Sequence, residues 1–174
     1  MDFDFSEEQL QLRDAVARYL GEEYDFDRYK AVRRSSAGWD REVWRGLAQL
    51  GVLGMFVPAE QGGLGFGPVE MLITATECGR HLVLEPVLSS AVIATAALRP
   101  FAAEPAVSAL MAAMAAGEKI ATLAHFESDA RFEGRWVTTH ARRTAGGYRL
   151  DGHKGVVMHA PIADTLLVSA RTSG

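Results

Sequence analysis

The sequence predicts an α+β fold in which a helical domain, over residues 1–117, precedes a β-rich segment, over residues 118–174. Two observations support this division. Up to Gly117 the chain carries helix caps, prolines at helix starts and apolar residues at helical spacing. Beyond Gly117, short β-branched runs alternate with Gly-Gly and Asp-Gly turn signals. A run of helices followed by a run of strands is typical of separate domains rather than of alternating βαβ units.

The first predicted helix begins just after Ser6. The Ser6 hydroxyl is a candidate N-cap, and Gln9 lies three residues later, where its side chain completes a capping box. Apolar residues then recur four positions apart, at Leu12, Val16 and Leu20. This spacing places them on one face of a helix, which we expect to be buried.

A second cap signal lies at Asp40. Trp39 and Trp44 occupy the positions that flank an N-cap in a hydrophobic staple. We expect a helix from this point to about Leu50, and we expect it to stop at Gly51, because glycine commonly follows the last helical residue.

Three prolines mark further helix starts, because a first helical residue tolerates the missing N–H of proline. Pro68, Pro86 and Pro105 open segments of about 69–81, 87–99 and 105–116. The last segment is rich in alanine, which favours a helix, with low-complexity disorder as the alternative. Its larger apolar residues favour a packed helical face; they are Val107, Leu110, Met111 and Met114.

The segment after Gly117 contains four runs with strand character, over 119–126, 136–143, 156–158 and 165–170. Gly146-Gly147 and Asp151-Gly152 are hairpin turn signals between them. Four or five strands with open edges make a poor independent sheet. We therefore expect the sequence to stop inside a β-domain.

The composition limits the classes of function. The 174 residues carry a net charge of −4 at pH 7, and the pI is about 5.7, which argues against nucleic acid as a partner. The single cysteine, Cys78, excludes an internal disulfide and favours a reducing compartment. No signal peptide and no apolar run long enough to span a membrane can be recognised. We expect a cytoplasmic protein.

Several catalytic motifs are missing from the sequence. It contains no Gly-x-Ser-x-Gly elbow, no phosphate loop with Gly-Lys-Ser/Thr and no His-Glu-x-x-His. The glycine-rich stretch 62–67 lacks dinucleotide-fingerprint spacing and predicts a tight loop in which glycine supplies backbone freedom. The histidines of the β-rich segment show no metal-ligand spacing; they are His125, His140, His153 and His159. We expect no metal site.

Three stretches together resemble the acyl-CoA dehydrogenase family. The first is FSEEQ at 5–9, followed by LRD at 12–14. The second, which is the most specific, is WxxLxxLGVLG at 44–54, followed by VPAEQGGLG at 57–65. The third is AGEKIA at 116–121, followed later by DGHK at 151–154 and by Ala163 and Asp164. The order and spacing match over essentially the whole chain.

The resemblance implies an N-terminal all-α helical domain, then the first strands of a middle β-barrel-like domain, without the family's C-terminal helical domain. It also implies oxidation of an acyl-CoA thioester to its 2,3-enoyl form, in which a base removes the α-proton and FAD receives the β-hydride. In the family the base is a glutamate, usually in the C-terminal domain, so we expect no catalytic residue in this chain. Members are usually tetrameric and pass their electrons to an acceptor.

The flavin-contacting stretches depart from the family pattern. Where members read Thr-Glu-Pro and then Gly-Ser-Asp, this chain has Phe126-Glu127-Ser128 and then Arg131-Phe132. After Lys154, the aromatic and the hydroxyl residues of the second stretch are missing. The resemblance assigns cofactor contacts to these stretches, at His125, Phe126, Glu127, Phe132, Val156, Val157 and Met158. It assigns substrate contacts to Arg131 and Phe132.

The combined pattern is similar to the small subunit of pimeloyl-CoA dehydrogenase and of other two-gene bacterial enzymes, in which two unlike chains assemble. A second acyl-CoA dehydrogenase subunit is therefore an expected partner. The alternative is a degenerate subunit that scaffolds its partner and binds no flavin. Two counter-ions are open for Arg131. One is a nearby carboxylate, of Glu127, Asp129 or Glu133, and the other is the free carboxylate of a dicarboxyl-CoA substrate.

Overall fold

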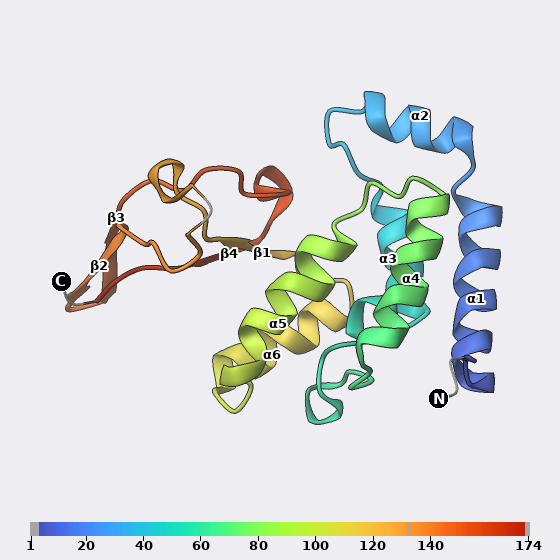
Figure 1. Cartoon of the computed structure of the whole chain (residues 1–174), viewed down its shortest axis with the longest axis horizontal. Helices are drawn as coiled ribbons and strands as arrows, with labels where there is room; N and C mark the ends of the chain where they lie inside the picture. The colour runs from blue at the N-terminus through green and yellow to red at the C-terminus, as the bar shows by residue number, and fades with distance from the viewer. Residues whose placement is uncertain (1–3, 132, 173–174) are drawn as a thin grey trace.

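The computed structural model describes residues 4–131 and 133–172 of the chain. Within them, six α-helices come first and four short strands follow, which confirms the predicted α+β fold (Figure 1). The helices occupy one half of the molecule and the strands the other. No described helix is long and apolar enough to cross a membrane.

Helix α1 (Glu7–Glu23) begins at the predicted capping box. The Ser6 hydroxyl accepts a hydrogen bond from the Gln9 N–H, and the Gln9 side chain accepts one from the Ser6 N–H. Val16 and Leu20 of the predicted stripe are fully buried. The local cap and the apolar spacing therefore describe the same helix.

Helix α2 (Phe26–Arg34) is absent from the prediction. Its N-terminus carries a recognisable signal, because the Asp25 carboxylate accepts a hydrogen bond from the Arg28 N–H at 2.7 Å. The helix has nine residues and buries only Val32, so the sequence shows no apolar stripe at this position.

Helix α3 (Arg41–Gln49) confirms the second cap signal. Asp40 Oδ1 accepts hydrogen bonds from the N–H groups of the first turn, and Gly51 follows the helix with a left-handed φ of +78°. The rings of Trp39 and Trp44 meet edge to face, with their centroids 6.4 Å apart. Trp44 is fully buried, which anchors the start of the helix in the core.

Two of the three proline-led helices form as expected, α4 (Pro68–Arg80) and α6 (Pro105–Ala115). The third prediction, one helix over 87–99, is wrong in detail. A π-helical segment, η3 (Val87–Ala94), is followed by α5 (Thr95–Leu98) and a short 3-10 turn, and Pro86 is the cap rather than the first helical residue. The Thr95 N–H bonds to the Ser90 carbonyl five residues back, which widens the turn.

The strands form two separate pairs. Strand β1 (Ala121–Ala124) lies parallel to β4 (Thr165–Val168), and β2 (His140–Thr144) forms an antiparallel hairpin with β3 (Gly147–Asp151). The predicted turn at Gly146-Gly147 is confirmed, with Thr144 opposite Gly147 in the register.

Three details of the strand prediction are wrong. Residues 156–158 form no strand, because Val156 has a φ of +50°, which extended backbone does not allow. Strand β2 begins at His140 rather than at Trp136. Gly152 follows the end of β3 but joins no second hairpin, since residues 156–158 are unpaired.

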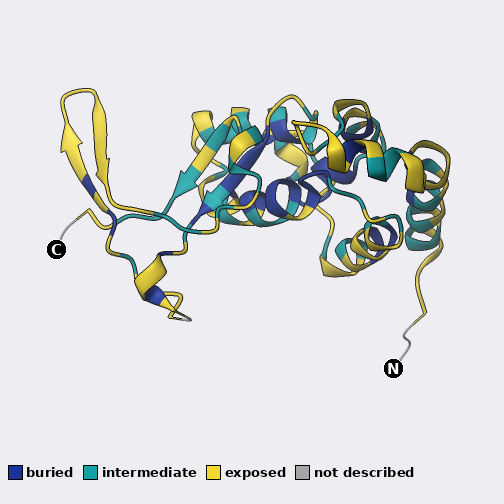
Figure 2. Cartoon of the chain, turned by 90° about the horizontal axis from the view of Figure 1, so that it is seen from above, coloured by how far each residue is buried: buried dark blue, intermediate teal, exposed yellow. Residues whose placement is uncertain are grey.

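The hydrophobic core lies almost wholly in the helical half. Figure 2 shows the buried residues gathered there, whereas the β2–β3 hairpin projects and is exposed along nearly all of its length. A second buried cluster joins the end of the helical half to β1 and contains Val57, Ala94, Leu98, Met111, Met114 and Ala121. The burial of Met111 and Met114 excludes disorder for the alanine-rich segment. The helices thus form a platform against which β1 is fixed.

Candidate functional site

A pocket of about 240 Å³ lies where the π-helical segment meets β1, and is called the junction pocket below. Four of its lining residues are expected cofactor contacts, His125, Phe126, Val156 and Met158. Four others were not expected, Ser89 and Ile93 from η3 and Thr122 and Leu123 from β1. Residues up to 69 positions apart in the sequence therefore share one hollow. The lining of the pocket is mainly apolar.

Three hydrogen bonds hold the walls of the junction pocket together. Ser90 Oγ accepts from the Ala121 N–H at 3.2 Å, which joins η3 to β1. Thr122 Oγ1 donates to the Met158 carbonyl at 2.8 Å, and the Gly155 N–H donates to the Phe126 carbonyl at 2.8 Å. The second and third bonds fix the segment 155–158 against β1 and the residues that follow it.

His159 provides a further link between the two halves. Its Nδ1 lies 2.8 Å from the Ser89 hydroxyl oxygen, across 70 residues of sequence. Its backbone is left-handed, with a φ of +56°, which is uncommon for a residue other than glycine. The contact with Ser89 holds this turn against the π-helical segment.

Glu127 does not line the junction pocket. Its carboxylate forms an ion pair with Lys154 at 2.7 Å, and the two side chains are 4% and 8% exposed. Thr138 and Thr139 each donate a backbone and a hydroxyl hydrogen bond to it. The Lys154 ammonium, with the two threonines, holds the pKa of Glu127 well below its usual range. Glu127 is therefore a charged residue with a structural role, and it lies outside the junction pocket.

Lys154 also determines the hydrogen bonding of His125. Its ammonium donates to Ser169 Oγ at 3.0 Å, so the Ser169 hydroxyl proton is free to point at His125 Nδ1, 2.9 Å away. His125 Nε2 then carries the proton that is donated to the Gly134 carbonyl at 2.9 Å. Both ring nitrogens are engaged, so His125 has no nitrogen left for a ligand in the junction pocket.

The remaining expected contacts lie outside this pocket. Arg131 is exposed, and it makes no ion pair with any residue that the structure describes, so the expected pairing with a nearby carboxylate is wrong for those residues. Phe132 lies outside the described residues. Val157 does not line the pocket, and its carbonyl accepts a hydrogen bond from the Ala160 N–H.

The junction pocket combines an apolar lining with main-chain donors that no described residue uses. A ring system with polar edges needs an apolar slot and a few well-placed donors. The main-chain N–H groups of Val156 and Met158, two of the residues that line the pocket, donate to no described residue. Main-chain donors do not depend on which side chains the sequence carries at these positions. In the part of the chain that the structure describes, no cluster of three or more His, Cys, Asp or Glu could hold a metal ion.

Nothing in the sequence marks Ser89 and Thr122 as neighbours. Each falls inside a predicted helix or strand, where a hydroxyl side chain usually forms a hydrogen bond with the nearby backbone. The one local hint is the Ser89-Ser90 pair within an otherwise apolar run. Only the packing of η3 on β1 brings these residues together.

Comparison with known proteins finds relatives along the whole chain. The family model described as the acyl-CoA dehydrogenase N-terminal domain matches residues 6–118. The chain is 31% identical over 174 residues to acyl-CoA dehydrogenase FadE27 of Mycobacterium tuberculosis, an alignment that covers 99% of the chain. It is 29% identical over 173 residues to benzylmalonyl-CoA dehydrogenase of Aromatoleum aromaticum, with 98% of the chain covered.

A solved structure shows the same fold. A chain of the ChsE4–ChsE5 complex from Mycobacterium tuberculosis superposes with a TM-score of 0.84 at 29% identity and covers 98% of this chain. In all three comparisons the alignment spans 45% of the relative's own length.

Proposed function

Because the chain belongs to the acyl-CoA dehydrogenase family, we propose that its protein oxidises an acyl-CoA thioester to the 2,3-enoyl form. The observation that carries this proposal is the junction pocket, an apolar slot whose lining includes Val156 and Met158, two residues with main-chain N–H groups that donate to no described residue. FAD, when bound, supplies the acceptor for the hydride that leaves the β-carbon. In the family the base is a glutamate of the C-terminal domain, so the role of this chain is to bind and orient.

Different residues of the chain contribute to binding and to orientation. Ile93 and Leu123 exclude water from the pocket, which strengthens the polar contacts inside it. The N–H groups of Val156 and Met158 bind the polar edge of the ring system. Thr122 positions these donors through its bond to the Met158 carbonyl. The buried Glu127–Lys154 pair fixes the two cofactor-contacting stretches relative to each other.

The organisation and the partners of the protein form part of this proposal. The helical domain extends over residues 1–117 and the partial middle β-domain over 118–174; the order of α6 and β1 on either side of Gly117 supports this. A second acyl-CoA dehydrogenase subunit is a proposed partner, supported by the likeness to a chain of the ChsE4–ChsE5 complex. An electron-transfer acceptor and a cytoplasmic location complete the proposal.

A specific observation favours the second candidate function, a scaffolding subunit without flavin. Val156 and Met158 stand where the family carries an aromatic and a hydroxyl residue. The Val156 side chain is 86% exposed and its backbone is left-handed, which is unusual for a β-branched residue. If Val156 has no flavin to cover, the cofactor belongs to the partner subunit alone.

Production of the complete protein together with the proposed partner subunit decides between the two functions. Flavin content per subunit and acyl-CoA dehydrogenation are measured for the wild type and for Thr122→Val. We expect Thr122→Val to lower the flavin content, because the Met158 carbonyl loses its donor. Thr76→Val, which removes an exposed hydroxyl elsewhere, is the matched control. A colourless wild-type subunit beside a yellow partner supports the scaffold instead.

The acyl group that we propose is dicarboxylic. Arg131 is exposed and without an ion pair among the described residues, and its planar guanidinium suits a carboxylate. In the complete enzyme, Arg131→Gln should raise KM for a dicarboxyl-CoA far more than for a fatty acyl-CoA of equal length. Equal losses on both substrates would leave Arg131 with no part in substrate selection.

A further inference from the structure

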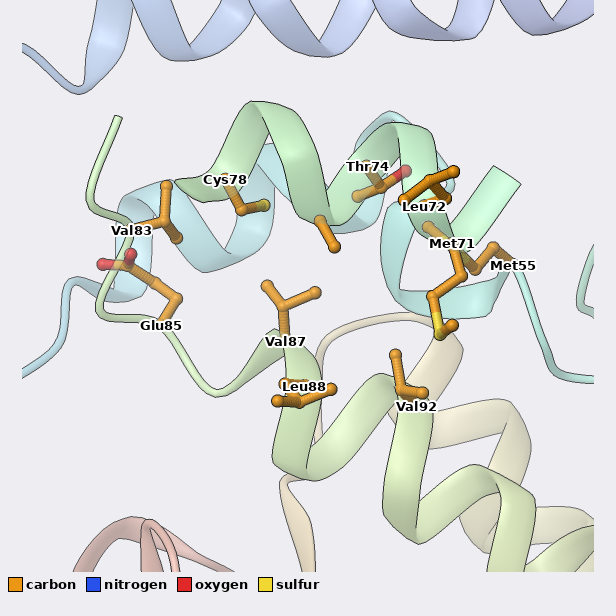
Figure 3. A pocket seen from close by; sticks show the side chains of 11 residues that line it. Met55, Met71, Leu72, Thr74, Cys78, Val83, Glu85, Val87, Leu88 and Val92 are labelled. Atoms are coloured by element: carbon orange, nitrogen blue, oxygen red, sulfur yellow. The ribbon is translucent and has the colours of Figure 1, made fainter. Parts of the chain in front are cut away.

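The hollows outside the junction pocket differ in what they offer a ligand. One cavity, between helix α4 and η3, is lined mainly by aliphatic and methionine side chains (Figure 3). Its unpaired polar atoms, Thr74 Oγ1 and Glu85 Oε2, are fully buried, so no group that enters the cavity can reach them. A ligand site needs a few polar groups within reach to select its ligand. A second hollow meets this requirement, because the charged side chains that line it are exposed.

The second hollow is called the α3 hollow below, and its volume is about 350 Å³, within the range of about 300–1,000 Å³ for small-molecule sites. Its walls come from the first part of α3, from the turn over residues 116–118 that follows α6, and from the residues just before β1 and β4. It therefore lies where the helices meet the strands. It shares no lining residue with the junction pocket.

Two arginines of α3 line the α3 hollow. Arg41 and Arg45 are exposed, and their spacing of four residues places them next to each other on the helix. Neither makes an ion pair with any residue that the structure describes. The Arg41 guanidinium lies over the Trp39 ring, 5.5 Å from its centroid. Like charges at this spacing destabilise a helix, and an anion bound between them would remove that cost.

The acidic residue of α3 does not neutralise this pair. Glu42 lies three residues before Arg45, which is a spacing at which helical ion pairs form. Its carboxylate pairs instead with Arg28 of α2, at 3.1 Å. The charge of Arg45 is therefore not compensated from its own helix.

Two carboxylates also line the α3 hollow, and they differ in how far they are neutralised. Asp164 accepts the Ile120 N–H at 2.8 Å and pairs with Lys119 at 3.2 Å. These two groups, together with the charge of Arg41, hold the pKa of Asp164 below its ordinary value. Glu118 makes no ion pair within the described part of the chain. The lining thus carries two uncompensated cations against one uncompensated anion.

We propose that the α3 hollow is a binding site for a small monocarboxylate, held by Arg41 and Arg45. The planar guanidinium binds a carboxylate at two points, and two guanidinium groups can hold one carboxylate from both sides. A single negative charge matches the excess charge of the lining. A phosphate ester carries nearly two negative charges, so Glu118 would repel it more strongly.

The remainder of the lining suits a short hydrocarbon chain. The half-buried side chains of Trp39 and Ile162 provide apolar surface beside the arginines. The proposal is independent of the acyl-CoA oxidation at the junction pocket, because the two sites share no residue.

The indole N–H of Trp39 reports on this site directly, because Trp39 lines the α3 hollow. In the complete protein with ¹⁵N-labelled indole groups, the Trp39→Phe variant identifies the Trp39 signal. A titration with butyrate at constant ionic strength should shift this signal saturably. The signal of Trp136, which lies outside the hollow, should not move. Butyramide, which has nearly the same shape and no charge, should leave both signals unchanged.

Substitutions in the lining should act in opposite directions. Arg45→Gln should weaken butyrate binding about threefold to tenfold, because it removes one charged partner of the carboxylate. Glu118→Gln should strengthen it about twofold to fivefold, because it removes the repulsion. Arg34→Gln, which changes an exposed arginine of α2 outside the hollow, is the matched control and should bind as the wild type does.

Inorganic phosphate, titrated in the same way, tests the choice of ligand and should bind more weakly than butyrate. Four results would overturn the proposal: no saturable shift of the Trp39 signal, an equal shift with butyramide, tighter binding of phosphate than of butyrate, or equal affinities for Arg45→Gln and the wild type.

Discussion

At the scale of single residues, Asp40 connects three segments of the helical half. Its Oδ1 caps α3, its Oδ2 pairs with Arg28 at 2.8 Å, and its N–H donates to Glu85. It therefore joins the N-terminus of α3 to α2 and to the loop before the π-helical segment. The sequence shows the cap, but the two long-range contacts appear only in the fold.

Substitution of Asp40 tests the cap and the ion pair separately. Asp40→Ala should lower the free energy of unfolding by about 0.5–2 kcal/mol, because the first-turn N–H groups lose their acceptor. Asp40→Asn keeps an acceptor for the cap and removes only the charge, so it should cost less. Urea denaturation measures both. An unchanged midpoint for Asp40→Ala would show that the cap contributes nothing.

The same pair of variants predicts a pH dependence. Burial alone would raise the pKa of Asp40, but the hydrogen bonds from Arg28, Glu42 and Val43 lower it overall from its ordinary 3.8. A carboxyl whose pKa is lower in the folded state stabilises above its unfolded pKa, and the stabilisation is lost as the pH falls through the folded value. The difference in stability between wild type and Asp40→Asn should therefore begin to shrink as the pH falls toward the ordinary pKa of 3.8, and should go on shrinking below it, through the lower folded pKa.

In the β-rich half, the buried Glu127–Lys154 ion pair joins distant segments, as the contacts of Asp40 do in the helical half. Glu127→Gln and Lys154→Met should each lower the melting temperature, because each leaves a buried partner uncompensated. The double variant should lose less than the sum of the two, which is the sign of a coupled pair. Lys119→Met, in the exposed pair with Asp164, is the control and should cost at most about 1 kcal/mol. Additive losses for the buried pair would contradict this interpretation.

At the scale of elements, the glycine-rich loop after Val57 requires glycine for two different physical reasons, which apply at different positions. Gly62 and Gly65 adopt left-handed φ values of +81° and +63°, which confirms the expected need for backbone freedom. Gly63 has no such φ. A Cβ on Gly63 would lie 2.0 Å from the Val57 carbonyl oxygen, which also accepts the Gly65 N–H, so there the requirement is close approach of the backbone.

Two alanine substitutions distinguish these reasons. Gly63→Ala should destabilise the protein by at least about 3 kcal/mol, because the clash is with backbone that cannot move alone. Gly62→Ala meets nothing within 4 Å and should cost only the left-handed strain, about 1 kcal/mol. Denaturation midpoints of the two variants provide the comparison. Equal costs would mean that conformational freedom, not close approach, decides both positions.

At the scale of the whole molecule, the β-rich half leaves much surface open. The accessible surface is 11022 Å², against about 8,300 Å² for a compact monomer of 18.9 kDa. The strands form two pairs with free edges, and Tyr148, Leu150 and Leu166 are at least half exposed on them. Such edges and patches favour pairing with another chain.

Residues 1–174 produced alone should therefore self-associate at micromolar concentration. Light scattering after size-exclusion chromatography measures the mass. Leu166→Lys, which places a charge on the outer face of β4, should reduce the association, whereas Arg142→Lys should not, because it keeps the charge of the β2–β3 hairpin. A monodisperse wild-type monomer at high concentration would rule this out.

We also expect these residues alone to retain no stoichiometric flavin.

Much of the helical half follows from short-range signals. The capping box at Ser6, the cap at Asp40 and the prolines that open α4 and α6 each act within one helical turn, and the structure confirms them. The failures have a common cause. Helix α2 buries a single residue, and the π-helical turn depends on bonds from Thr95 to Ser90, so neither produces an apolar pattern that can be recognised in the sequence.

The sequence by itself determined the order of helices before strands, most helix starts, the turn of the hairpin and the family. Tertiary structure alone decided which residues form the sites. Ser89 reaches His159 across 70 residues, and Glu127 pairs with Lys154 across 27. Caps and turns are set by hydrogen bonds between residues a few positions apart, whereas a pocket is set by which surfaces pack together, and that depends on the whole chain at once.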